Sequence, residues 1–299
     1  MESEQEHRCG YAAIVGRPNV GKSTLLNAIL GQKVSITASK PQTTRHQILG
    51  IKSVEGGQLV FIDTPGIHQG TPKAINRYMN RVARAVLADA DVVLWVVEAA
   101  RLTEEDRALG ESLKSVDAPV LCIINKIDRL RDKRELLPFL EQLNRDYRLA
   151  EVLPVCALES DGVDVVEAEV LERLPFSRPF YDADQITDRS ERFLAAEFVR
   201  EQITRCTHEE VPYATTVEVE NYVHEEGLVR IGILIWVERE GQKAIIIGRK
   251  GETLRKIGSR ARKALEALLG EKVFLQTWVK VKQGWSDDER ALRAFGYQE

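Results

Sequence analysis

Short apolar runs alternate with longer amphipathic stretches from residue 11 to about residue 174. The apolar runs predict buried strands, and the helical spacing of apolar side chains between them predicts helices. This alternation is typical of an α/β fold in which helices cover both faces of a mostly parallel sheet. We expect strands over 12–15, 48–54, 59–62, 92–97, 120–124 and 152–155, and helices over 22–30, 73–87, 104–116, 134–145 and 163–174.

The pattern changes after residue 174. Pro175 and Pro179 lie close together, where they would end a helix and stiffen the chain. A chain of 299 residues is also long enough for two domains. We therefore expect a first domain over 1–174, a linker over 175–187 and a second domain over 188–299.

The second half has the pattern of an α+β unit: a helix, two strands, a short helix, a long amphipathic helix, a strand and a terminal helix. Asp188 with Glu191 resembles a capping box at the start of the first helix, and Ser286 with Glu289 resembles one at the start of the last. The last strand carries apolar residues on one side. Its other side carries Phe274, Trp278, Lys280 and Lys282, which could bind single-stranded RNA or pack under a helix. We favour packing.

A phosphate-binding loop lies between the first expected strand and the first expected helix. Its pattern is G-x-x-x-x-G-K-S/T, in which backbone N–H groups and a helix N-terminus face an anion. Lys22 would place its charge on the β- and γ-phosphates, and the Ser23 hydroxyl would bind Mg²⁺. The residues of this nucleotide-binding loop are Gly16, Arg17, Pro18, Asn19, Val20, Gly21, Lys22, Ser23 and Thr24.

The third expected strand ends in Asp63-Thr64-Pro65-Gly66. Ligands of parallel sheets bind at the carboxyl ends of the strands, where Asp63 could hold Mg²⁺ directly or through water. The Gly66 N–H could approach the γ-phosphate. Thr44, or less favourably Thr43, could complete the Mg²⁺ shell when a γ-phosphate is present. Lys22, Thr44 and Gly66 are thus the expected catalytic residues.

Two motifs predict that the base is guanine. Asp128, in Asn125-Lys126-Ile127-Asp128, can accept from guanine N1–H and the N2 amino group, which adenine lacks, so its carboxylate would stay unpaired against adenine. Lys126 can cover the base, and Asn125 can brace the loop. Cys156-Ala157-Leu158 follows the last expected strand, and the Ala157 N–H is a candidate donor to guanine O6.

The residue after Gly66 is Ile67, which cannot orient an attacking water as a glutamine would. We therefore expect slow GTP hydrolysis, on the order of 10⁻⁴ to 10⁻² s⁻¹. Asn19 resembles the asparagine that helps hold K⁺ in potassium-activated GTPases, although a loop-bracing amide is an equally good interpretation. Stimulation by K⁺ or by a partner is the hypothesis that follows.

Gly248-Arg249-Lys250-Gly251 precedes the long amphipathic helix. Two glycines around two basic residues let a phosphate backbone approach the main chain, as in the K-homology loop. Residues 239–282 contain twelve Lys or Arg and four Asp or Glu, whereas the whole chain has a net charge of −4. The basic segment therefore predicts a local RNA site. Its expected residues are Gly248, Arg249, Lys250, Gly251, Lys256, Arg260, Lys280 and Lys282.

Composition limits the remaining classes of function. The four cysteines are far apart, which argues against a zinc site or a disulfide framework and indicates a reducing compartment. The polar, largely charged N-terminus predicts no signal peptide. No apolar run reaches the ~20 residues needed to span a bilayer.

The nucleotide motifs resemble those of translation-factor-related GTPases. Together with the basic GxxG segment, they resemble the Era family within the TrmE-Era-EngA-like P-loop GTPases, over nearly the full length. The resemblance implies a type II K-homology fold that binds 16S-type ribosomal RNA near its 3′ end. It also implies a role in assembling the 30S subunit, and a monomer that is cytoplasmic and partly peripheral at the inner membrane. Cys156 departs from the serine that is usual in the family.

Two alternatives stay open at this point. The chain could be another RNA-directed GTPase, such as a tRNA-modification enzyme, although a single nucleotide domain with a GxxG loop argues against that. It could also be an RNA chaperone that binds nucleotide without hydrolysing it. The intact Lys22, Ser23, Thr44 and Asp63 argue against the chaperone, while Ile67 favours it.

Overall fold

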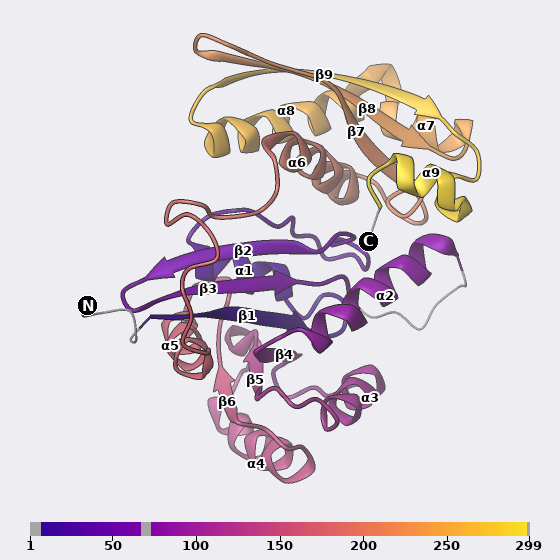
Figure 1. Ribbon diagram of the computed structural model, residues 1–299. Helices are drawn as coiled ribbons and strands as arrows, with labels where there is room; N and C mark the ends of the chain where they lie inside the picture. Colours follow the sequence, from indigo (N-terminus) through magenta and orange to yellow (C-terminus); the bar gives the residue numbers. More distant parts are fainter. Residues whose placement is uncertain (1–6, 67–72, 298–299) are drawn as a thin grey trace. The chain divides into compact units, whose positions relative to one another are not determined.

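The computed structural model describes residues 7–66 and 73–297 (Figure 1). Ile67, on which the expectation of slow hydrolysis depends, lies outside the described residues. The chain forms two compact units. The first contains most residues up to Asp188, and the second contains residues from Arg189 onward together with 36–43 and the described part of 70–78.

The first unit is built on a six-stranded sheet with the order β2-β3-β1-β4-β5-β6. Only β2 is antiparallel to its neighbour; the other described pairs in this sheet are parallel. The six strands are β1 Arg8–Val15, β2 Ile48–Val54, β3 Gly57–Asp63, β4 Val92–Glu98, β5 Val120–Asn125 and β6 Glu151–Pro154. The four inner strands are buried on both faces, as their nearly continuous apolar runs require, whereas the edge strands β2 and β6 carry some exposed residues.

Helices cover both faces of this sheet, which confirms the predicted α/β class. Apolar residues of α1 (Lys22–Leu30) and α5 (Val163–Arg173) pack in one core, and those of α3 (Glu104–Leu113) and α4 (Leu136–Asp146) pack in the other. The remaining long helix is α2 (Ala74–Ala88). The parallel order brings the ends of β1, β3, β4 and β5 to one edge, where the predicted nucleotide motifs begin.

Residues 175–187, which the sequence predicts as a linker, are part of the first unit. The Phe180 ring stacks on Tyr11 with a centroid distance of 5.3 Å. Gln58, which is buried, accepts from the backbone N–H groups of Phe180 and Tyr181 at 2.9 and 3.0 Å. These contacts join residues far apart in sequence, so the local composition of the segment did not reveal them.

The second unit combines a three-stranded sheet, order β7-β8-β9, with helices that cover one of its faces (Figure 1). β8 is antiparallel to β7 and parallel to β9. This is the predicted α+β unit, including the short helix before Gly248. The elements are α6 Glu191–Cys206, β7 Thr215–Glu225, β8 Leu228–Val237, α7 Glu240–Ile247, α8 Glu252–Leu269, β9 Lys272–Val281 and α9 Glu289–Ala294.

Both capping predictions for this unit are wrong by two residues. The Ser190 hydroxyl caps α6 by accepting from Phe193 N, while the Asp188 carboxylate accepts from Leu49 N. Asp288 caps α9, while the Ser286 hydroxyl donates to Glu238 at 2.6 Å. In each case the capping residue lies directly before the helix, and the residue that was expected to cap it makes a hydrogen bond to a distant part of the chain instead.

The polar side of α6 is also buried, because residues 36–43 pack against it within the second unit. Thr37 N donates to Glu201 Oε1 at 2.9 Å, and Lys40 Nζ donates to the Thr204 carbonyl at 2.7 Å. Arg200 and Glu197 form a buried ion pair at 2.6 Å. Segment 36–43 therefore provides hydrogen-bond partners for polar and charged side chains of α6 that would otherwise be left without them.

The aromatic side of β9 differs from the prediction. Phe274 and Trp278 are 44% and 43% exposed, so this side does not pack under a helix. Arg230 lies 5.2 Å from the centre of the Phe274 ring. Helices α6 and α8 pack in the core on the opposite face of the sheet. Among the helices of residues 7–66 and 73–297, none combines the length and apolarity that crossing a bilayer demands.

Candidate functional site

The phosphate loop connects the end of β1 with the start of α1. Gly21 has φ 103°, and a Cβ there would lie 2.2 Å from Asn125 Nδ2, so only glycine fits. Lys22 is buried, and its Nζ donates to the carbonyls of Gly16 and Arg17 at 2.8 and 3.0 Å. Burial lowers the pKa of Lys22 to about 8, although the nearby Asp63 charge opposes that shift. A bound phosphate would favour the charged form.

The three residues predicted to hold Mg²⁺ lie together. Ser23 Oγ donates to Asp63 Oδ2 at 2.6 Å and lies 2.8 Å from Thr44 Oγ1. Thr43 instead donates to the Lys40 carbonyl, so Thr44 is the threonine at this site. Two hydroxyls and a carboxylate are the hard oxygen donors that Mg²⁺ prefers.

Asp63 is fully buried at the end of β3. Burial raises the pKa of its carboxyl group, and hydrogen bonds from Ser23 and Ser35 partly offset this shift. Within the part of the chain that the structure describes, Asp63 Oδ1 has no hydrogen-bond partner. A buried carboxylate oxygen without a partner is costly, and a hydrated cation would satisfy it. The residues therefore fit the metal.

The rest of the Asp63-Thr64-Pro65-Gly66 motif turns back toward the phosphate loop. Thr64 Oγ1 donates to the Ile14 carbonyl at 2.8 Å, which ties the motif to the neighbouring strand β1. A Cβ on Gly66 would lie 2.8 Å from Pro18 Cγ, so the backbone of Gly66 packs closely against the phosphate loop. The Gly66 backbone is thus in place beside the loop that would hold the phosphates.

Asn125 connects three loops of the nucleotide site. It is 2% exposed, and its Nδ2 donates to the Val20 carbonyl at 2.9 Å. Its Oδ1 accepts from Lys126 N at 2.8 Å and from Ala157 N at 3.1 Å. The Ala157 N–H that was expected to face guanine O6 therefore has a protein acceptor in this structure.

Asp128 lies in the loop over residues 125–128, called the base loop below, on the short 3₁₀ helix that follows β5. Its side chain is exposed at the rim of the site. The Cys156 thiol donates to Asp128 Oδ1 at 3.2 Å, which orients the carboxylate. Cys156 and Ala157 are buried, whereas Leu158 is 80% exposed. Lys126 adopts φ 65° and donates from Nζ to the Asn19 carbonyl at 2.6 Å, so its stem crosses from the base loop to the phosphate loop.

A second candidate site is an open groove of about 430 Å³ between α8 and β9 in the second unit. Gly248, with φ 72°, and Gly251, with φ 78°, flank Arg249 and Lys250 at its end. The groove has an apolar floor and two arginines, a combination suited to stacked bases and phosphates. The residues that line it are Gly251, Leu254, Arg255, Gly258, Ser259, Arg262, Leu275 and Thr277.

Of the eight predicted RNA-binding residues, only Gly251 lines this groove. Gly248, Arg249 and Lys250 lie next to it in the GxxG loop, and the other four lie elsewhere. Lys256 and Arg260 are exposed on α8, and Arg260 Nη1 contacts Cys206 Sγ at 3.9 Å. Lys280 lies on the opposite side of β9 from Leu275 and Thr277, with its Nζ 5.7 Å from the centre of the Trp236 ring. Lys282 similarly lies 4.6 Å from the centre of the Phe295 ring. None of these four residues is part of the groove lining.

Comparison with known proteins identifies both units. Residues 11–126 match the family model of the 50S ribosome-binding GTPase, and residues 210–286 match that of the KH domain. GTPase Era of Pseudomonas aeruginosa (strain LESB58) is 58% identical over 290 residues, which cover 97% of this chain and 95% of that protein. The chain belongs to the Era family of GTPases. GTPase Era of Stenotrophomonas maltophilia (strain K279a) is 52% identical over 298 residues, 100% of each chain.

Solved Era structures have the same fold. A point variant of Aquifex aeolicus Era bound to GDP·AlF4⁻ aligns with a TM-score of 0.94 at 38% identity, covering 98% of this chain and 100% of that chain. An Era complex with MgGDPNP and nucleotides 1506–1542 of 16S ribosomal RNA aligns with a TM-score of 0.93 at 38% identity and the same coverage. The chain is therefore a GTPase with a C-terminal KH domain, as the sequence predicts.

Four residues of this Era-family GTPase belong to these sites but were not predicted from the sequence. Ser35 is fully buried and donates to Asp63 Oδ2 at 2.8 Å, but an isolated serine in a polar segment gave no signal. Arg255 and Arg262 follow Gly251 by four and eleven residues, so helical spacing would have placed them on one face. Glu98 at the end of β4 could have been found as the polar residue that ends a buried strand.

Proposed function

We propose that this protein binds GTP through its first unit and 16S-type ribosomal RNA through its second, and that it assists assembly of the 30S subunit. The observation that carries the nucleotide half is the grouping of Lys22, Ser23, Thr44 and Asp63 with the base loop at one edge of one sheet. The relative solved with MgGDPNP and a 16S fragment supports both halves, because it aligns over nearly the whole chain.

In the nucleotide site, each residue would have a separate task. Mg²⁺ would neutralise charge on the β- and γ-phosphates, held by Ser23, Thr44 and Asp63. The Lys22 ammonium would leave its two carbonyl partners for the phosphates, and the Gly66 N–H would face the γ-phosphate. Asp128 would pair with the guanine edge, which excludes adenine.

In the RNA site, we propose that single-stranded bases lie in the groove while phosphates pass over Gly248 and Gly251. Gly248 and Gly251, on either side of Arg249 and Lys250, have no side chains that would keep an RNA backbone at a distance, which favours close contact with the main chain. Arg255 and Arg262 would add positive charge along the groove. Lys256, Arg260, Lys280 and Lys282 would contribute to the surrounding positive potential.

The turnover test uses Lys22→Ala. GTP hydrolysis followed by phosphate release should fall to the buffer rate in this variant, while RNA affinity in the absence of nucleotide should not change. Turnover that survives the substitution would refute the assignment of the site. A wild-type protein that binds GTP without any turnover would instead favour an RNA chaperone.

The RNA test uses three charge-reversal pairs with equal change in net charge. Arg255→Asp with Arg262→Asp should reduce binding of a 16S 3′-end oligonucleotide by more than tenfold, as should Arg249→Asp with Lys250→Asp. Lys280→Asp with Lys282→Asp, on the other side of β9, should have a smaller effect. Equal losses in all three variants would show that net charge rather than the groove determines binding. GDP affinity should be unchanged throughout.

The remaining proposals rest on the sequence and the family. We propose a GTPase domain over 1–174, a linker over 175–187 that packs on the GTPase domain, and an RNA-binding domain over 188–299. We also propose a monomer that is cytoplasmic and partly peripheral at the inner membrane. Sedimentation tests the oligomeric state, and cell fractionation tests the location. We also propose that Asn19 helps hold K⁺; equal hydrolysis rates in K⁺ and Na⁺ would remove Asn19 from that role.

A further inference from the structure

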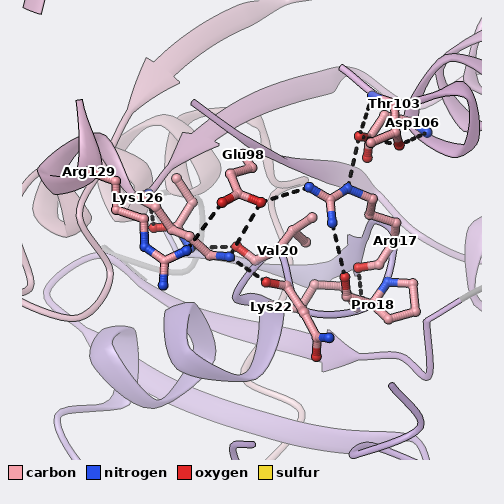
Figure 2. A network of polar contacts seen from close by, with 11 residues as sticks. Arg17, Pro18, Val20, Lys22, Glu98, Thr103, Asp106, Lys126 and Arg129 are labelled. Carbon is pink, nitrogen blue, oxygen red and sulfur yellow. Dashed lines mark hydrogen bonds and ion pairs between the residues drawn. The ribbon is translucent and has the colours of Figure 1, made fainter. Parts of the chain in front are cut away.

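Figure 2 shows a group of charged side chains that joins three loops of the first unit. Glu98 is the last residue of β4, and its side chain is 17% exposed. Its Oε2 accepts from Arg17 Nη2 at 2.8 Å and lies 3.6 Å from Lys126 Nζ. Its Oε1 lies 3.3 Å from Arg129 Nη1. One carboxylate is therefore shared by cations from the phosphate loop and from the base loop.

The position of Glu98 in the sheet explains why it can be shared. β4 lies between β1, which leads into the phosphate loop, and β5, which leads into the base loop. Glu98 is directly beside Asn125 in the register of β4 and β5. A side chain at the end of the middle strand can reach both loops, whereas one from either outer strand would have to cross the middle strand.

Arg17 is held from a second side. Its Nε donates to Asp106 Oδ2 at 3.0 Å, and Asp106 is fully buried. The same oxygen accepts from Thr103 N at 3.0 Å and from Thr103 Oγ1 at 2.8 Å in the capping box of α3. The guanidinium is thus committed to two carboxylates, so Arg17 anchors the phosphate loop to the sheet instead of reaching for a phosphate.

Lys126 is held in a similar way. Its Nζ contacts the Asn19 carbonyl and the Glu98 carboxylate, and both contacts stretch its stem between the two loops. Burial lowers the pKa of Lys126, and the charge of Glu98 opposes that shift. Burial would raise the pKa of Glu98, but the hydrogen bond from Arg17 and the charge of Lys126 outweigh it, and the net shift is downward. Arg17 and Glu98 therefore favour the charged form of one another, and Glu98 opposes the loss of charge that burial favours at Lys126.

We propose, on the basis of the proposed GTP site, that Glu98 is a positioning residue. As the shared counter-ion of Arg17 and Lys126, it fixes the spacing of the phosphate loop and the base loop. Within residues 7–66 and 73–297, its ion pairs are with Arg17, Lys126 and Arg129 and not with the residues that would hold Mg²⁺. Glu98 therefore acts on nucleotide affinity and not on the hydrolytic step. GDP and GTP share the base and the first two phosphates, so both should be affected equally.

Glu98→Gln keeps the shape of the side chain and removes its charge. It should weaken GDP and GTP binding by about tenfold each, because Lys126 and Arg17 each lose a charged carboxylate partner. The rate constant kcat at saturating GTP should stay within about twofold of wild type, while KM rises. Glu111→Gln is the matched control, since Glu111 pairs with Lys114 at 2.8 Å on the exposed side of α3 and should have no effect.

The deciding experiment is a double-mutant cycle with fluorescent GDP, using wild type, Glu98→Gln, Lys126→Met and the double variant. If Glu98 acts through Lys126, its substitution should cost less than about threefold in the Lys126→Met background. The same tenfold loss in both backgrounds, or a Glu98→Gln protein that binds GDP as wild type does, would overturn the inference. Glu98→Asp, which keeps the charge, should bind GDP more tightly than Glu98→Gln; the reverse order would also overturn it.

The wild-type titration separates this inference from the proposed function. Wild-type protein that does not prefer guanine nucleotides would refute the nucleotide assignment itself. Wild-type protein that does prefer them, combined with an unaffected Glu98→Gln, would refute only the role of Glu98. Circular dichroism shows whether Glu98→Gln folds. If it does not, the same cycle built from wild type, Glu98→Asp, Lys126→Met and their double variant still tests the coupling.

Discussion

Replacing Asn125 by alanine removes a side chain that makes hydrogen bonds to the phosphate loop, the base loop and the loop after β6. The amide is 2% exposed, and its partners are the Val20 carbonyl and the N–H groups of Lys126 and Ala157. Alanine cannot pair with any of them. The substitution therefore tests whether these loops are held together before nucleotide binds.

The expected magnitude follows from the groups left without partners. Val20 and Ala157 are fully or almost fully buried, so their backbone groups gain little from water. Leaving a buried polar group unsatisfied costs about 1–3 kcal/mol, and two such groups give about 2–4 kcal/mol once partial relaxation is allowed for. For a unit of this size, that loss lowers the midpoint of thermal unfolding by roughly 5–12 °C.

Differential scanning calorimetry of the nucleotide-free protein measures this directly, because the transition of the first unit should shift while that of the second stays in place. Asn144→Ala is the matched control, since Asn144 is exposed on α4. GDP affinity should also fall in Asn125→Ala. A midpoint that drops no further than in Asn144→Ala would refute the view that Asn125 holds the loops together.

Three further predictions follow from the two sites. Burial lowers the pKa of Lys22 to about 8, and bound phosphate should raise it again, so GDP binding should take up almost one proton at about pH 9 and almost none at about pH 6.5; calorimetry in buffers of different ionisation enthalpy measures this, and equal uptake at both pH values would contradict it. Cys156→Ser keeps a donor to Asp128 and should bind GDP within about twofold of wild type, whereas Cys156→Ala should bind it a few-fold more weakly; equal affinities would show that this hydrogen bond is irrelevant. Gly248→Ala should destabilise the second unit more than Gly251→Ala, because a Cβ at 248 would lie 2.2 Å from Thr253 Oγ1 while one at 251 meets open space; unfolding midpoints decide between them.

The nucleotide half of the molecule was predictable to a large extent. Its motifs follow strands whose apolar runs are unmistakable, and parallel strands bring their carboxyl ends together without further information. The sequence alone therefore predicts that Ser23, Thr44 and Asp63 lie near one another. It could not predict Ser35 or the Asp106 partner of Arg17, because those contacts depend on how distant segments pack.

The second half was less predictable for a different reason. Alternation along β9 gave its two sides correctly, but not which side a helix would cover, and the aromatic side turned out to be exposed. The basic residues were counted as a set, whereas the groove selects those at helical spacing from Gly251. The charged side of α6 could not be interpreted locally, since its partners lie in segment 36–43.

The central claim is that a guanine nucleotide occupies the loops at the end of the first sheet. The most direct test is competition of GTP, GDP, ATP and ADP against fluorescent GDP on the purified, nucleotide-free protein. The account predicts that GTP and GDP compete at concentrations about 10⁴-fold lower than ATP and ADP, because Asp128 finds no donors on adenine. Equal competition by adenosine and guanosine nucleotides would contradict it.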